Sequence, residues 1–156
     1  MSGGSNDMPP SRSEIVQQIM AAKVGNGLRW TDVAEALETS KEWAAAACLG
    51  QMTMAAEQAD AAVELFGLPA EASAVLQVPP SRGSLDQAVP SDPLIYRFYE
   101  VVSVYGTTLK ELIHEEFGDG IMSAIDFRMN LEREPDPAGD RVRITMSGKF
   151  LPYRTY

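Results

Sequence analysis

The chain has 156 residues, of which 45% are hydrophobic and 22% charged, enough for one sizeable core or two small ones. The net charge of −9 repels phosphate backbones, so general nucleic-acid binding is disfavoured. A single cysteine, Cys48, excludes an intrachain disulfide, and no apolar run is long enough to span a bilayer. We therefore expect a cytoplasmic protein with no membrane partner. Residues 1–10, rich in Gly, Ser and Pro, predict a flexible tail instead of a signal peptide.

Helical patterns fill the first half of the chain. Ser11 and Glu14 have the spacing of a capping box, and the helix they open should end at the Gly-Asn-Gly of 25–27. Apolar positions from Trp30 to Leu37 predict a second short helix. Two further helices are predicted, one opened by Thr39 and Glu42 and containing residues 43–47, the other over residues 55–66. Short helices with tight turns indicate a bundle of the helix-turn-helix type over residues 11–78.

Such a bundle raises the alternative of a DNA-binding regulator. A recognition helix normally brings Arg or Lys to phosphates and bases. Residues 31–50 contain one cation, Lys41, against four acidic side chains: Asp32, Glu35, Glu38 and Glu42. The charges therefore favour a structural or oligomerising bundle over a DNA reader.

The second half begins with a proline-rich linker at residues 78–93, so we place the boundary between the bundle and a second domain, 79–156, at its start. Asp92-Pro93 is a typical helix start. We expect that helix to end near Tyr105, with Gly106 as a breaker. A new helix should run from Thr108 to Phe117, with Gly118 just past its end.

Beyond Gly120 the apolar period changes to two, which predicts a half-buried strand around residues 125–131. A second strand is predicted over 141–146, followed by a turn at Ser147-Gly148 and a short extended tail. Two strands make a poor sheet alone. They need a partner, and another subunit is the natural source.

The residues alone give little chemistry. Arg97 and Glu100 share a helix face, which pattern alone would assign to a surface ion pair. His114 is the single histidine, so a His-pair metal site is excluded, and it is expected to be a partly exposed helix residue. Cys48 lies in an alanine-rich helix and should be a small core residue.

The segment 82–127 gives information about function that the hydrophobic and charge patterns do not. It reads RGSLDQAVPSDPLIYRFYEVVSVYGTTLKELIHEEFGDGIMSAIDF and closely resembles the cyanase (cyanate hydratase) family. The resemblance rests on Arg-Gly at 82–83, DP-x-x-YRFYE at 92–100, YGTTLK at 105–110, HE-x-FGDGI at 114–121 and SAI-x-F at 123–127. The ending GKFLP at 148–152 is also similar to the family's.

The resemblance implies an α+β fold, in which an N-terminal helical bundle of the helix-turn-helix (lambda-repressor-like) kind precedes a helix-plus-strand dimerisation domain. It implies a lyase that decomposes cyanate with bicarbonate to carbon dioxide and carbamate, detoxifying cyanate. It further implies a homodecamer, five dimers in a ring, with active sites at subunit interfaces. The catalytic residues implied are Arg97, Glu100 and Ser123, and no metal or organic cofactor is expected.

Overall fold

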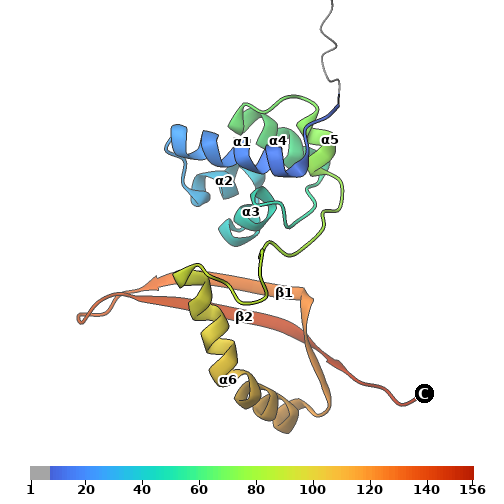
Figure 1. Cartoon of the computed structure of the whole chain (residues 1–156), viewed down its shortest axis with the longest axis vertical. Helices are drawn as coiled ribbons and strands as arrows, with labels where there is room; N and C mark the ends of the chain where they lie inside the picture. Colours follow the sequence, from blue (N-terminus) through green and yellow to red (C-terminus); the bar gives the residue numbers. More distant parts are fainter. Residues whose placement is uncertain (1–7) are drawn as a thin grey trace, which may run out of the picture. The chain divides into compact units, whose positions relative to one another are not determined.

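The computed structural model describes residues 8–156. The predicted tail at 1–10 therefore lies mostly outside the described residues. The chain divides into two compact units, Met1–Ser84 and Leu85–Tyr156, and each is a separate body with its own elements (Figure 1).

The first unit is a bundle of five helices in the part of the chain that the structure describes: α1 (Arg12–Gly25), α2 (Trp30–Leu37), α3 (Lys41–Cys48), α4 (Ala56–Phe66) and α5 (Ala72–Leu76). Each helix contributes an apolar stripe to one shared core. Ile15 and Ile19 of α1, Val33 of α2 and Leu76 of α5 are fully enclosed there. Cys48 is buried in the same core, as predicted.

Helix ends follow the local sequence, with one correction. Ser11 and Glu14 form the predicted capping box of α1. The cap of α3, however, is Ser40 and not Thr39: the Ser40 Oγ accepts from the Trp43 backbone N–H at 3.1 Å. Either hydroxyl can cap a helix, so spacing to an acidic residue could not decide between adjacent candidates. The short α5 was not predicted.

The second unit begins with one long helix, α6 (Pro93–Phe117). Asp92 caps it as predicted, its Oδ1 accepting from the backbone N–H groups of Leu94 and Ile95. The predicted break at Gly106 is wrong, because the helix continues through it to Phe117, with Gly118 as its C-cap. A helical glycine costs only about 1 kcal/mol relative to alanine, which a 25-residue helix can absorb.

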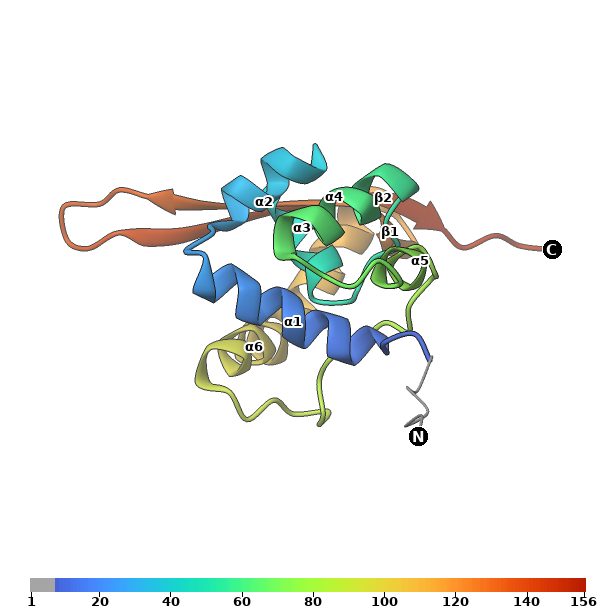
Figure 2. The same ribbon diagram turned by 90° about the horizontal axis from the view of Figure 1, so that it is seen from above.

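The remainder of this unit is an antiparallel hairpin of β1 (Gly120–Glu134) and β2 (Arg141–Pro152). Its connecting loop and the C-terminal tail lie at opposite ends of a long ribbon (Figure 2). The predicted turn at Ser147-Gly148 is wrong: β2 runs straight through these residues, and Gly148 pairs with Phe127. The register shifts between Met122 and Phe127, where β1 carries a bulge.

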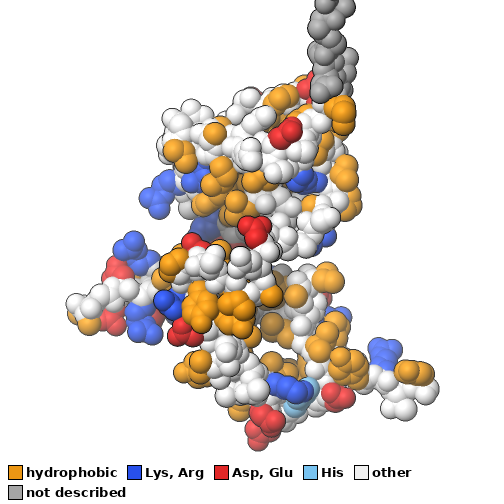
Figure 3. Space-filling model, viewed as in Figure 1, with side chains coloured by type: hydrophobic (Ala, Val, Ile, Leu, Met, Phe, Trp, Pro, Cys, Tyr) orange, Lys and Arg blue, Asp and Glu red, His pale blue; other side chains and the backbone are white. Residues whose placement is uncertain are grey.

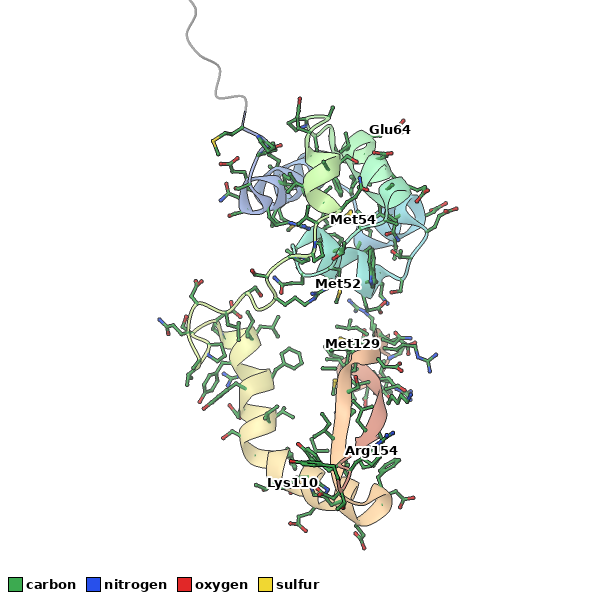
Figure 4. All side chains as sticks on the ribbon, turned by 90° about the vertical axis from the view of Figure 1, so that its right-hand side faces the viewer. Met52, Met54, Glu64, Lys110, Met129 and Arg154 are labelled. Atoms are coloured by element: carbon green, nitrogen blue, oxygen red, sulfur yellow. The ribbon has the colours of Figure 1, made fainter. Side chains whose placement is uncertain are left out.

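Almost nothing in this second unit is enclosed by the chain itself. No residue of α6 is buried, and Ile125 of β1 is 97% exposed. Figure 3 shows hydrophobic side chains gathered on the surface of this unit, and Figure 4 shows side chains standing out along α6, where Lys110 is labelled, and along the hairpin, where Met129 is labelled. The half-buried strand predicted from alternation is therefore largely exposed in the single chain. Within residues 8–156, no helix is both long and apolar enough to cross a membrane.

Candidate active site

Arg97 and Glu100 lie one turn apart near the start of α6, and their side chains meet. The Arg97 Nη1 donates to the Glu100 Oε2 at 2.8 Å. The guanidinium carbon lies 5.6 Å from the centre of the Tyr96 ring, within the range of a cation–π contact. The two side chains are 61% and 53% exposed, so this ion pair contributes little to stability.

Only part of the Arg97 guanidinium is used by this contact. A guanidinium carries five N–H donors in a planar fork. In the described part of the chain, its hydrogen-bond partner is the Glu100 carboxylate, reached through Nη1. Donors therefore remain for a planar anion, which arginine can hold through two parallel hydrogen bonds.

Ser123 occupies the bulge of β1 and is the one buried polar residue among those the structure describes, at 6% exposure. Its Oγ accepts from the backbone N–H of Ile125 at 3.0 Å and of Asp126 at 2.9 Å. A hydroxyl has two acceptor lone pairs and one donor. Since both lone pairs are engaged, the remaining capacity of Ser123 is to donate its own proton.

The structure brings Arg97 and Glu100 together but does not join Ser123 to them within one chain. In residues 8–156, Ser123 makes its side-chain hydrogen bonds to the bulge backbone alone. The three side chains thus come from α6 and from β1 as two separate groups. Both groups lie in the unit that leaves most of its apolar side chains uncovered.

The structure also shows the environments of His114 and Cys48, the two other residues considered from the sequence. His114 is half-buried near the end of α6, where its Nδ1 contacts the Gly118 carbonyl oxygen at 2.9 Å and its Nε2 contacts the Lys110 Nζ at 2.6 Å. Burial raises the pKa of Cys48 to about 12, so its thiol stays protonated and is a poor nucleophile. Across the described residues, no three His, Cys, Asp or Glu side chains are placed to hold a metal ion.

The sequence did not predict the bulge that encloses Ser123. A signal was available in β2, because a glycine inside a strand often marks a bulge or a close approach of another backbone. The Ser-Gly pair at 147–148 is equally typical of a turn, so the local sequence does not distinguish a turn from a strand that passes close to a bulge.

Comparisons with known proteins cover almost the whole chain. Residues 12–80 match the model of the cyanate hydratase N-terminal domain, and residues 87–155 match that of the cyanate lyase C-terminal domain. The cyanate hydratase of Methylibium petroleiphilum is 65% identical over 94% of this chain and 99% of its own length. That of Cupriavidus necator is 66% identical over the same shares.

A solved structure agrees with the fold. The crystal structure of cyanase from T. urticae superimposes with a TM-score of 0.77 at 38% identity, covering 89% of this chain and 97% of the other. A helical bundle followed by a long helix and an antiparallel hairpin, with these relatives, defines an α+β lyase. The chain belongs to the cyanate hydratase (cyanase) family.

Proposed function

We propose that this chain decomposes cyanate with bicarbonate, and that Arg97, Glu100 and Ser123 are its catalytic residues. Cyanate, bicarbonate and one proton give carbon dioxide and carbamate, and carbamate takes a second proton to give ammonia and carbon dioxide. The family membership supports the reaction. The observation that carries the site is the Ser123 hydroxyl, whose engaged lone pairs leave it a donor suited to an anion.

Both substrates are anions, so the site must first overcome their repulsion. Two unit charges about 4 Å apart repel by about 4 kcal/mol at an effective dielectric constant near 20. Arg97 suits this task, since its charge is permanent and its fork holds two oxygens at once. The effect is local, so the net charge of −9 does not oppose it.

Bicarbonate is itself a nucleophile, so Ser123 need not be activated as one. Its hydroxyl donates to a substrate anion and orients it. Glu100 holds the Arg97 fork by the 2.8 Å contact and carries the proton that the cyanate nitrogen requires. Proximity and electrostatic preorganisation supply most of the acceleration. The chain's residues in this scheme act without a metal or organic cofactor.

The site is completed, in this proposal, where subunits meet, within a homodecamer built of five dimers. The support is the uncovered surface of the second unit, where α6 buries none of its residues and β1 exposes Ile125 almost fully. Exposed apolar surface of this kind is typical of interfaces. Copies of Arg97 from several chains would then supply more than one positive charge from a single position. The proposed location is the cytoplasm, which cell fractionation checks.

The test is bicarbonate-dependent release of ammonia from cyanate by the purified protein, with its mass measured by light scattering. Ammonia release that requires bicarbonate, from particles of decamer mass, is the expected result. Salt-dependent DNA binding without ammonia release would instead identify the regulator considered from the sequence. Full activity in a monomer would refute the interface site, and assembly without turnover would refute the enzyme.

A further inference from the structure

Strand β2 crosses the bulge of β1 at a glycine. Gly148 pairs with Phe127, at the point where the register resumes after the bulge. A β-carbon built on Gly148 would lie 2.3 Å from the backbone oxygen of Ser123 and 2.6 Å from the Met122 Cγ. Real β-carbons essentially never approach other atoms this closely, so any other residue at position 148 must displace β2 or the bulge.

The glycine is required here for space and not for an unusual backbone angle. Gly148 is not one of the described glycines with positive φ, so another residue could adopt its conformation. Of its two close neighbours, the Met122 side chain is flexible and can turn away. The carbonyl of Ser123 is backbone inside a bulge and cannot move without moving the residue.

We propose that Gly148 is a positioning residue for the reaction, acting through Ser123. By allowing β2 to lie directly against the Ser123 carbonyl, it holds the bulge in the shape that presents the Ile125 and Asp126 amides to the Ser123 Oγ. Those two hydrogen bonds leave the hydroxyl proton one direction in which to point. This inference rests on the proposed catalytic role of Ser123.

A displaced carbonyl alters the site because the carbonyl and the hydroxyl belong to the same residue. The two hydrogen bonds that the Ser123 Oγ accepts, of 3.0 and 2.9 Å, weaken when the bulge opens. The hydroxyl can then form hydrogen bonds with other groups, and its proton is no longer directed at the substrate. A misplacement of about 1 Å costs about 10²-fold in rate in a preorganised site. The loss should fall mainly on kcat, because the anion-binding fork of Arg97 lies on another element.

The experiment compares four forms of the full chain: wild type, Gly148→Ala, Ser123→Ala and the double variant. Light scattering gives the assembled mass, and ammonia release at saturating bicarbonate gives kcat and KM for cyanate. We expect Gly148→Ala to assemble and to lose about 10²-fold in kcat with a smaller change in KM. In the Ser123→Ala background the same substitution should lower kcat almost no further, because the effects of substitutions at coupled residues are not additive.

Two glycine variants serve as controls. Gly25→Ala, at the end of α1, meets nothing within 4 Å and should leave kcat unchanged. Gly120→Ala places a β-carbon 2.4 Å from the Leu151 carbonyl oxygen, a clash of the same kind that avoids Ser123. We expect its cost to add to that of Ser123→Ala, in contrast to that of Gly148→Ala.

The outcomes separate the inference from the proposed function. Wild-type kcat in Gly148→Ala, or an undiminished cost in the Ser123→Ala background, overturns the positioning role while leaving Ser123 catalytic. Wild-type kcat in Ser123→Ala refutes the proposed role of Ser123 itself, and the positioning role with it.

If Gly148→Ala does not assemble, hydrogen exchange on the wild-type protein decides the question. A bulge held closed by β2 protects the amides of Ile125 and Asp126, so they should exchange far more slowly than those of the tail at 154–156. Exchange as fast as in the tail would overturn the positioning role.

Discussion

Replacing Arg97 with lysine separates the chemistry of this side chain from its contribution to stability. The substitution keeps the positive charge but replaces a planar fork of five donors by a compact ammonium. If Arg97 holds a substrate anion through two hydrogen bonds, lysine at this position loses one of them.

The two expected effects differ widely in size. The Arg97–Glu100 pair is more than half exposed on both sides, and such helical pairs contribute about 0.3–0.5 kcal/mol. Lysine can still pair with Glu100, so the change in the free energy of unfolding should be smaller than this. A hydrogen bond to a charged group is worth about 1.5–3 kcal/mol, which corresponds to a loss of about 10- to 10²-fold in kcat/KM.

The assay is steady-state ammonia release over a range of cyanate and bicarbonate concentrations, with the midpoint of thermal unfolding and the assembled mass measured on the same samples. Arg97→Met serves as the companion variant, and it should lose more activity because the charge is also removed. Wild-type kcat/KM in Arg97→Lys would refute the bidentate role. A fall in the midpoint of thermal unfolding large enough to account for the lost activity would show that the substitution acts through stability, and would refute the separation of the two effects.

Three further predictions concern other residues. Glu100→Gln should lower kcat more than it raises KM for cyanate, and equal effects on both would contradict the proton-relay role. Cys48→Ala should remove a loss of stability at alkaline pH. Burial raises the folded-state pKa of this thiol to about 12 from 9.0. The protonated thiol therefore contributes its full stability below pH 9, and this contribution is lost as the pH rises towards 12. Unfolding midpoints of both proteins at pH 8 and pH 10.5 check this, and parallel curves would contradict it. Arg12→Met should destabilise the helical unit by about 1–3 kcal/mol, because the Arg12 Nη2 donates to the carbonyl oxygens of Val75 and Val78. An unchanged melting profile in differential scanning calorimetry would argue against a stabilising role for these two hydrogen bonds.

Most elements could be predicted because their signals are local. The capping box of α1, the Asp92-Pro93 start of α6 and the two alternating strands each depend on a few neighbouring residues. Two of the errors fell on glycines. Gly106 continues a helix and Gly148 continues a strand, because tertiary context overrides the weak local preference of a glycine.

The candidate site likewise has one part that local sequence predicts and another that it does not. The pairing of Arg97 with Glu100 follows from helical spacing and is present in the structure. The state of the Ser123 hydroxyl could not be predicted, since it depends on a register shift between strands that no local pattern encodes. The assignment of all three residues to one reaction comes from the family resemblance and stays a prediction.

Helix α6 has a consequence for the amount of working enzyme in a cell. In the proposed homodecamer, a helix that buries none of its residues in its own chain would draw its hydrophobic stabilisation from other subunits, and its free energy would then depend on protein concentration. Dilution should therefore loosen the second unit before the first, whose core is complete within one chain. Activity per molecule would then rise with expression level, and in a cell that makes little of the protein a larger share of the copies would have an intact bundle and no turnover.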